Sequence, residues 1–468
     1  MSSNTIVYAP HDVWPDLRPM PQRAEKSRVF RVILAGFILF ALPLSTVSSF
    51  GDNLVKLALS DCAIPIVAAC LLYYFATSRL RLPYLGLCLG HISLCILSAL
   101  FNFSATLSLG RIHLMIELLK PLIGWFYFYG LVNLVRSHDD LAAALVSWKW
   151  GAVLCSALGI AGVFLYTTFG TRTPFAEMFR AQGTLEDANL FACHVSISIF
   201  LVMLLKGLKR GSRMMTAITT VALLVGLILS ASRGGVLAFL CAFTVFQLTS
   251  QVRRWRLIVG LWIVPIVLLG LSVSQVDDLP PWMQPAAQRL TTLTLNPQSE
   301  QGMQRSAQWE VAWGGFVSSP LIGIGRGNYK LLASSHATYL GSYAHNTFIG
   351  AMCDLGIPGL VCYLLIFLLP CFPGVRNAKV LGSISKDTRP VLIAGCCLFV
   401  VVGLTINIEN YRGLWAFAAL AVAMPRLTGG KEWGSPIMPG FLYVIPDKTD
   451  EQQFARETGN LGSLVPAE

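Results

Sequence analysis

Residues 188–206 read ANLFACHVSISIFLVMLLK, a run in which Lys206 is the only Asp, Glu, Lys or Arg. A helix that crosses a lipid bilayer needs about 20 mostly apolar residues, so this run predicts a membrane span. Similar runs recur along the chain, and we expect twelve spanning helices. They are expected at residues 29–50, 54–76, 82–101, 112–135, 144–169, 188–206, 214–230, 232–250, 255–275, 346–370, 388–407 and 411–427.

The composition of the whole chain agrees with this interpretation. Hydrophobic residues make up 54% of the 468 residues and charged residues 13%, whereas an ordinary soluble domain has about 25% charged residues. The mean hydropathy is +0.62. We therefore predict an all-α integral membrane protein. The surplus of 35 Lys and Arg over 24 Asp and Glu fits anionic lipids or anionic substrates and gives no reason to expect nucleic acid.

The basic residues of the loops predict the orientation of the chain. Lys and Arg gather in the N-terminal arm and in alternate short loops, and such loops stay on the cytoplasmic side of a membrane. Both termini are then cytoplasmic. The expected organisation is a tail at 1–28, nine spanning helices within 29–275, an outer loop at 276–345, three spanning helices within 346–427 and a tail at 428–468.

The outer loop at 276–345 is much longer than the other outer connections, and long loops of this kind usually carry function. Trp309, Trp313 and Phe316 recur there at helical spacing, which predicts an amphipathic helix from about 303 to 318. Two placements of this helix remain open: along the outer membrane interface, or packed on the helical bundle.

Arginines in the outer loops are informative, because Lys and Arg that only set the orientation of a membrane protein gather in the cytoplasmic loops. The arginines that fall on the outer side are Arg111, Arg172, Arg180, Arg233, Arg289, Arg305, Arg326 and Arg412. The planar guanidinium group can bind a phosphate group through two hydrogen bonds and stays charged in a partly dry site. For Arg233, a span-end arginine that reaches for water is an equal alternative.

His345 stands where the outer loop meets the span at 346–370, so its imidazole can reach both a lipid headgroup and a soluble acceptor. Near neutral pH an imidazole can accept a proton from a hydroxyl group. The alternative is that His345 only caps the following helix. His336 is a weaker candidate of the same type. The histidines at 91, 113 and 194 lie inside apolar runs and are interpreted as structural.

The acidic residues argue against a metal site. Glu186–Asp187 and Asp277–Asp278 are adjacent pairs without the alternating spacing of many metal-using transferases. We interpret them as solvated or capping residues, with Asp187 and Asn189 capping the helix that follows. The 12 cysteines fall almost entirely in apolar runs, which argues against a disulfide framework or a cysteine zinc site. No metal and no cofactor are expected.

Two further patterns have structural interpretations. Glu117 and Lys120 are three residues apart on one predicted span and are expected to pair, because charges within the membrane usually neutralise one another. A minority alternative is that this pair lines a groove that admits lipid. The glycines of PLIGIGRGNY at 320–329 lack the preceding strand and full spacing of a nucleotide-binding loop.

Five short motifs together resemble one family. They are RAQG with DAN within 180–189, SRGG at 232–235, RSAQW at 305–309, PLIGIG at 320–325 and HN with LGIPGL within 345–360. In this order, and with a long outer loop before the histidine, they are similar to the bacterial O-antigen ligase and O-antigen polymerase superfamily. The resemblance covers about 180–370, while the first five spans match only as hydrophobic helices.

The resemblance implies a C-type glycosyltransferase architecture in the bacterial inner membrane, with the active site facing the periplasm and no metal. The donor would be an undecaprenyl-diphosphate-linked glycan, and the acceptor would be a glycan or the lipid A-core. A chain-length regulator is a further possible partner. His345 and Arg180 would be catalytic, and Arg233, Arg289, Arg305 and Arg326 would bind the diphosphate.

Three functions remain open from the sequence. A polysaccharide polymerase, for O-antigen or exopolysaccharide, is slightly favoured over an O-antigen ligase. The motifs do not separate the two roles, because donor and base are shared and only the acceptor differs. A flippase or transporter for the same lipid-linked glycan is the non-enzyme alternative. Transporters hold their binding charges near the middle of the membrane in repeated halves, whereas here the charges gather on the outer side.

Overall fold

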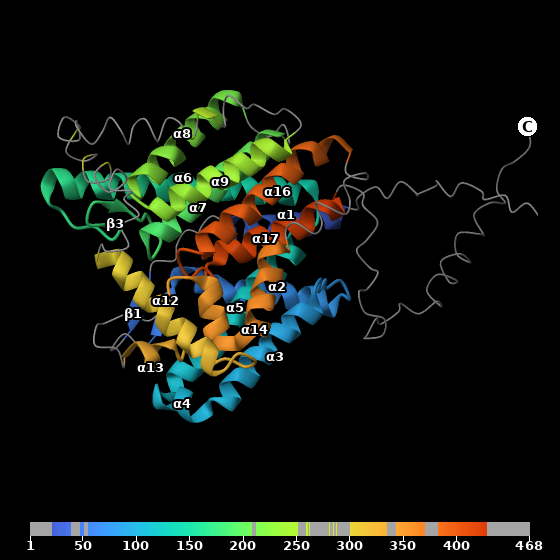
Figure 1. The fold of residues 1–468 in the computed structure, drawn as a ribbon. Helices are drawn as coiled ribbons and strands as arrows, with labels where there is room; N and C mark the ends of the chain where they lie inside the picture. Colours follow the sequence, from blue (N-terminus) through green and yellow to red (C-terminus); the bar gives the residue numbers. More distant parts are fainter. Residues whose placement is uncertain are drawn as a thin grey trace, which may run out of the picture. The chain divides into compact units, whose positions relative to one another are not determined.

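The computed structural model describes residues 21–38, 47–50, 55–207, 212–250, 300–334, 343–369 and 382–427, with isolated positions between 259 and 287. Apart from two short hairpins, the elements in these ranges are helices (Figure 1). The expected helical architecture is confirmed for this part of the chain.

The helices of the first part of the chain are α1 (Pro21–Gly36), the 3-10 helix η2 (Leu59–Ala63), α2 (Ile64–Ala76), α3 (Leu85–Phe101), α4 (Phe103–Ser108), α5 (Arg111–Leu134) and α6 (His138–Phe169). They are followed by α7 (Ala188–Gly207), α8 (Arg213–Leu229), α9 (Arg233–Thr249), α12 (Glu300–Ser318), α13 (Tyr329–Ser334), α14 (Thr347–Leu368), α16 (Gly382–Gly403) and α17 (Arg412–Leu427).

Several of these helices can cross a membrane. Within the described ranges, α5, α6, α7 and α14 are long and apolar enough to do so by length and composition. Six shorter apolar helices of 10–17 residues accompany them: Asp61–Ala76, Leu85–Phe101, Arg213–Leu229, Arg233–Thr249, Thr388–Gly403 and Arg412–Met424. The chain is a multi-pass membrane protein. The number of twelve spans and the orientation stay predictions, and the span expected at 255–275 lies almost entirely outside the described residues.

The facing ends of the first two predicted spans, 29–50 and 54–76, are not helical. Helix α1 ends at Gly36, and β1 (Val47–Phe50) pairs antiparallel with β2 (Val55–Ala58), with Phe50 opposite Val55. Hydropathy cannot distinguish an apolar strand from an apolar helix. The GDN sequence at 51–53 is rich in turn-forming residues and was the available signal for a hairpin.

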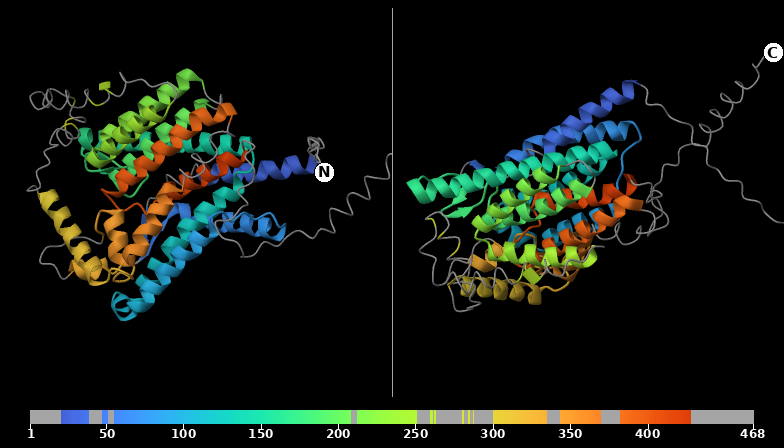
Figure 2. Two further views of the ribbon diagram at one scale, coloured as in Figure 1. Left: turned by 45° about the vertical axis from the view of Figure 1, so that its right-hand side comes forward. Right: turned by 90° about the horizontal axis from the view of Figure 1, so that it is seen from above.

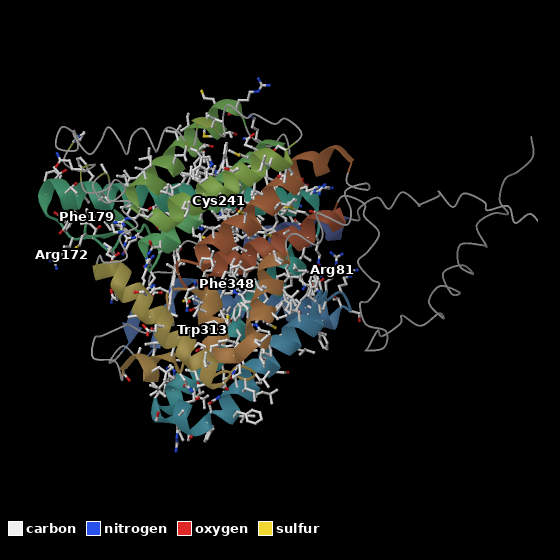
Figure 3. All side chains as sticks on the ribbon, viewed as in Figure 1. Arg81, Arg172, Phe179, Cys241, Trp313 and Phe348 are labelled. Atoms are coloured by element: carbon white, nitrogen blue, oxygen red, sulfur yellow. The ribbon has the colours of Figure 1, made fainter. Side chains whose placement is uncertain are left out.

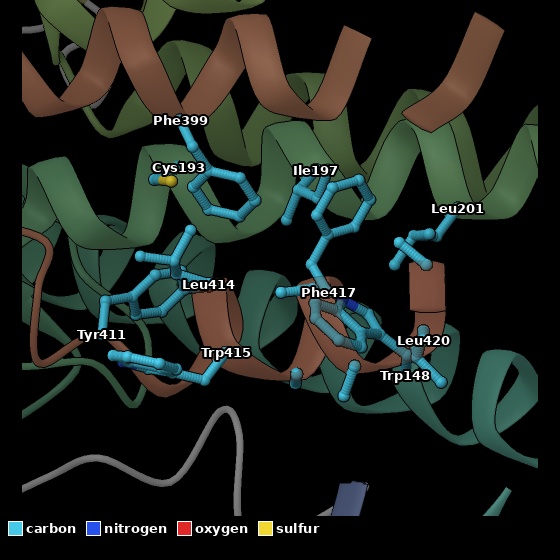
Figure 4. Packing of buried hydrophobic residues seen from close by; sticks show 14 of the residues in the cluster. Trp148, Cys193, Ile197, Leu201, Phe399, Tyr411, Leu414, Trp415, Phe417 and Leu420 are labelled. Atoms are coloured by element: carbon cyan, nitrogen blue, oxygen red, sulfur yellow. The ribbon is translucent and has the colours of Figure 1, made fainter. Parts of the chain in front are cut away.

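Helix α7 lies in the middle of the largest group of packed helices. It contacts α6, α8, α9 and α16, and Figures 1 and 2 show these elements side by side. In Figure 4, Ile197 and Leu201 of α7 face the rings of Phe399 and Phe417, near Trp148. Such all-round burial is typical of a helix inside a bundle. The apolar run at 188–206 therefore lies in the core of the fold.

Helix α12 is the predicted amphipathic helix, and its existence is confirmed. Its buried face includes Gln308 and Ala312, which are 3% and 0% exposed, and α12 packs on α13 and α14. At Gly315 an added Cβ would lie 2.7 Å from the Cys353 sulfur, so small residues permit this close contact. The two tryptophans that predicted the helix lie outside the buried face: Trp309 is 38% exposed and Trp313 is 52% exposed.

The segment after α12 is fixed against a kink in α14. The backbone N–H of Ile324 donates to the carbonyl of Cys353 at 2.9 Å, and that of Ile357 donates to Pro320 at 2.8 Å. The kink lies at Gly356, where φ is 69°. At Gly323, φ is 75° and an added Cβ would come within 2.3 Å of the Asp354 backbone. The PLIGIG and LGIPGL motifs thus form one packing unit. The close approach of the two backbones explains why Gly323 and Gly356 are glycines.

Candidate active site

Four of the predicted site residues come together from separate elements. Arg180 lies on β4 (Arg180–Ala181), which pairs with β3 (Ala176–Glu177), and Arg233 is the first residue of α9. Arg305 lies on α12 and His345 directly precedes α14. Electrostatic interactions connect Arg305 with Arg180 and Arg233, and connect His345 with Arg305. We call the three arginines the arginine cluster.

Arg180 is held by three separate acceptors. Its Nε donates to the carbonyl of Ser230 at 3.2 Å, Nη1 to Glu177 at 3.2 Å, and Nη2 to the Oδ1 of Asn189 at 3.0 Å. The residue is only 9% exposed. Because each contact fixes one side of the planar group, the orientation of the guanidinium is set before any ligand arrives.

Asn189 connects Arg180 with the start of α9. Its Oδ1 also accepts a hydrogen bond of 2.8 Å from the hydroxyl of Ser232. The Ser232 oxygen in turn accepts from the backbone N–H of Gly235 at 3.1 Å and thereby caps α9. The prediction that Asn189 caps α7 is therefore wrong, because its side chain points to other elements.

Asp187 does cap α7, as predicted. Its Oδ1 accepts hydrogen bonds from the backbone N–H groups of Asn189 and of Leu190, the latter at 3.3 Å. The carboxylate also interacts electrostatically with Arg305 and His345. One side chain therefore fixes the start of a core helix and supplies negative charge beside the arginine cluster.

The glycines after Arg233 allow α9 to begin in a crowded place. An added Cβ at Gly235 would lie 2.4 Å from the Cβ of Ala192, and one at Gly234 would lie 2.8 Å from the hydroxyl of Thr405. The first turn of α9, whose N–H groups carry partial positive charge, thus lies against α7 and the turn that precedes α17. This packing explains why two glycines follow the arginine.

Arg305 is the exposed member of the cluster. Among the described residues, no hydrogen bond or ion pair within 4 Å holds its guanidinium group. Partial desolvation lowers the pKa of Arg305; Asp187 opposes this change, and the positive charges of Arg233 and Arg180 add to it. Guanidinium groups this close destabilise one another electrostatically, and a bound anion would relieve that repulsion.

His345 is half-buried and has a left-handed backbone, with φ of 48°. Residues other than glycine seldom adopt this conformation, which often marks functional sites. Desolvation lowers the pKa of the imidazole below its ordinary value; Arg305 lowers it further, while Asp187 raises it. The neutral form, which can accept a proton, therefore predominates near pH 7.

The capping alternative for His345 is wrong, because Asn346 caps α14. The Asn346 Oδ1 accepts from the backbone N–H groups of Phe348 and Ile349 at 3.0 and 3.1 Å. Thr347 also ties this end of α14 to the turn before α17, through a 2.8 Å bond to the carbonyl of Ile406. These neighbours fix the backbone and leave the imidazole of His345 without a structural hydrogen bond to any described residue.

Arg326 lies in a different environment and is 2% exposed. Its Nη2 pairs with Glu409 at 3.2 Å, Nη1 donates to the hydroxyl of Tyr363 at 2.9 Å, and Nε donates to the carbonyl of Glu117 at 2.9 Å. Glu117 also pairs with Lys120, as predicted. The structure does not bring Arg326 to the arginine cluster, because buried acidic groups compensate its charge.

Not every residue singled out in the sequence falls within the described residues. Arg289, His336, Asp277 and Asp278 lie outside the described residues. In the described ranges, no group of three or more His, Cys, Asp or Glu residues could hold a metal ion. The expectation of a metal-independent site stays a prediction.

Comparison with protein families identifies one part of the chain. Residues 218–364 match the family described as O-antigen ligase. This segment is similar to the O-antigen ligase family. The resemblance expected from the motifs is thereby confirmed for 218–364, and the domain contains Arg233, Arg305 and His345, while Arg180 precedes it. A search of curated proteins finds no match. An O-antigen ligase domain indicates transfer of lipid-linked glycans of the ligase or polymerase type.

Proposed function

We propose that the protein transfers an undecaprenyl-diphosphate-linked glycan to a sugar hydroxyl at the periplasmic face of the bacterial inner membrane, acting as a polysaccharide polymerase. The observation that carries the proposal is the convergence of Arg180, Arg233 and Arg305 beside His345. An anion-binding group next to a neutral imidazole is what such a reaction needs.

The reaction assigns a separate role to each group. The imidazole of His345 accepts the proton of the acceptor hydroxyl, whose oxygen forms a bond to the anomeric carbon of the donor sugar. The bond between that carbon and the diphosphate oxygen breaks, and its electron pair leaves with the diphosphate. Arg180, Arg233 and Arg305 stabilise the negative charge that develops there. Arg289 is retained as a further candidate, and no metal or cofactor is invoked.

The polymerase and ligase roles share this donor chemistry. A polymerase extends a lipid-linked glycan, whereas an O-antigen ligase joins the glycan to the lipid A-core. We favour the polymerase slightly, and a chain-length regulator is then an expected partner. Supplying purified protein with donor and each acceptor in turn distinguishes the two, since only the true acceptor increases in mass.

A flippase for the same lipid remains the non-enzyme alternative. Purified protein in detergent has no sealed compartment. Release of undecaprenyl diphosphate from the glycan there therefore requires glycosyl transfer and cannot result from transport. Release would support the transferase, whereas transport into vesicles with no product in detergent would support the flippase.

The decisive variant is His345→Ala. A general base contributes typically about 10² to 10⁴ in rate. We therefore expect the release of undecaprenyl diphosphate per folded molecule to fall by that factor, while thermal stability stays unchanged. Asn346→Ala is the matched control: it removes the cap of α14 and should cost about 1 kcal/mol in stability. Preserved turnover in folded His345→Ala would remove the base assignment.

A further inference from the structure

The outer face of α12 continues directly from the arginine cluster. Arg305, Trp309, Trp313 and Val317 follow one another at intervals of four residues, so they form a stripe along one side of the helix. Trp309, Trp313 and Val317 are 38%, 52% and 60% exposed. Figure 3 shows Trp313 on the gold helix α12. From Arg305 to Val317 the helix rises about 18 Å.

The apolar surface does not stop where α12 ends. Leu321, just beyond the helix, is 69% exposed. Its segment is fixed to the kink of α14 by the hydrogen bond from Ile357 to Pro320. Beyond the kink, Ile357 and Val361 are each 48% exposed, and α14 is a spanning candidate. Exposed apolar side chains therefore occur from Arg305 along α12 to the exposed side of α14.

Charge and hydrophobicity are thus separated along this surface in the way that an amphipathic lipid requires. One end carries the guanidinium groups of the arginine cluster, and the other continues onto the exposed apolar side chains of α14, a spanning candidate. The stripe borders the face of α12 that packs on α14, and the Trp313 and Phe316 rings lie 5.1 Å apart at that border. A chain lying on the stripe would contact protein on one side and lipid on the other.

We propose that this stripe binds the isoprenoid chain of the polyprenyl diphosphate donor while the arginine cluster binds its diphosphate. The inference rests on the proposed function for the identity of the donor. Exposed tryptophans offer large rigid surfaces for hydrocarbon at little entropic cost. The residues at 309 and 313 would then determine the preference for a long prenyl chain.

The test measures binding, so it needs no turnover. Dissociation constants for undecaprenyl diphosphate and geranyl diphosphate are measured in detergent and in lipid nanodiscs, and their ratio reports the contribution of the long chain. In the double variant Trp309→Ser with Trp313→Ser, we expect undecaprenyl diphosphate to bind about tenfold more weakly, and geranyl diphosphate to change by less than about twofold.

Two control variants separate the parts of the ligand. Arg305→Gln should weaken both ligands by the same factor and leave their ratio unchanged, because both carry the diphosphate. Trp150→Ser alters a tryptophan that is 46% exposed on α6 and should change neither constant.

Three results would overturn the inference: an unchanged ratio in the tryptophan variant, an equal weakening of both ligands, or an effect seen only in nanodiscs. The last would show that α12 anchors in the bilayer without binding the prenyl chain. Failure of the proposed function is a different result, namely tight binding without diphosphate release in the presence of any acceptor.

Discussion

Three nitrogens of Arg180 have acceptors from three parts of the chain, and Asn189 is the acceptor that also reaches α9 through Ser232. Glu177, by contrast, is an exposed partner whose side chain is 56% accessible. Exposed ion pairs contribute little, whereas a buried hydrogen bond to a charged group contributes about 1.5–3 kcal/mol. At the residue scale, the orientation of the Arg180 guanidinium group therefore depends mainly on two neutral acceptors, the Ser230 carbonyl and the Asn189 side chain.

The first prediction concerns Asn189 as a positioning residue. Asn189→Ala removes the acceptor shared by Arg180 and Ser232, and we expect kcat to fall about tenfold or more. Asn189→Asp keeps an oxygen at that position and should retain most activity. Glu177→Gln should have less than about a twofold effect. Equal losses in the Ala and Asp variants would contradict the positioning role.

The second prediction concerns pH. The pKa of His345 is lowered, so activity should fall on the acid side only as the pH drops below the ordinary histidine range. Asp187→Asn removes a negative charge that raises this pKa and still caps α7. The acid limb of kcat/KM should therefore move to lower pH.

Two further variants check the sign of this effect. Arg305→Gln removes a positive charge and should move the acid limb to higher pH in its residual activity. Glu186→Gln, at the exposed neighbouring position, makes the same charge change as Asp187→Asn and should leave the profile unchanged. A limb that does not respond to Asp187 or Arg305 would show that another group titrates.

At the scale of elements, the contact between the 320–325 segment and the kink of α14 fixes the position of His345. Helix α14 begins two residues after His345 and is kinked at Gly356, where Pro320 and Ile324 bond to its backbone. The same segment follows α12 and so fixes the end of the helix that carries Arg305. This backbone contact thus links the element that carries His345, the proposed base, with the helix that carries Arg305.

The third prediction tests this contact. Gly323→Ala adds a Cβ at a left-handed position and in contact with the Asp354 backbone, so we expect a loss of stability of about 1–3 kcal/mol, measured by thermal unfolding in detergent. Gly314→Ala on α12 meets nothing within 4 Å and should be neutral or stabilising by about 1 kcal/mol. Similar behaviour of the two variants would argue against the packing unit.

At the scale of the whole molecule, the proposed reaction places the arginine cluster on the periplasmic side of the membrane. The basic loops predict the same orientation. Arg213, the first residue of α8, lies in the predicted cytoplasmic loop between the spans at 188–206 and 214–230 and is exposed, whereas Glu310 on α12 lies in the predicted outer loop and is exposed.

The fourth prediction concerns this orientation. A membrane-impermeant maleimide applied to intact spheroplasts should label Glu310→Cys, while Arg213→Cys should be labelled only after the membrane is opened. The unmodified protein controls for its own cysteines, of which Cys62 is exposed. Labelling of both positions from the same side would mean that the topology is wrong.

Much of this protein could be predicted from single residues and their spacing. Apolar runs located α3, the helices from α5 to α9, α14, α16 and α17 to within about six residues, because hydrophobic length is a local property. The short helix α4 was not predicted. The motif order indicated the O-antigen ligase domain and brought forward Arg180, Arg233, Arg305 and His345. The spacing of Trp309 and Trp313 predicted α12.

What the sequence could not show depends on contacts between distant residues. The hydrogen bond between Asn189 and Ser232 and the ion pair between Arg326 and Glu409 each join groups that lie far apart in the chain. Arg305 and Arg326 look alike as outer arginines, yet one is exposed beside two other arginines and the other is buried among carboxylates. Hydropathy and motif spacing fix which residues are present in each element, but the charge that surrounds a guanidinium group is fixed only when the elements pack.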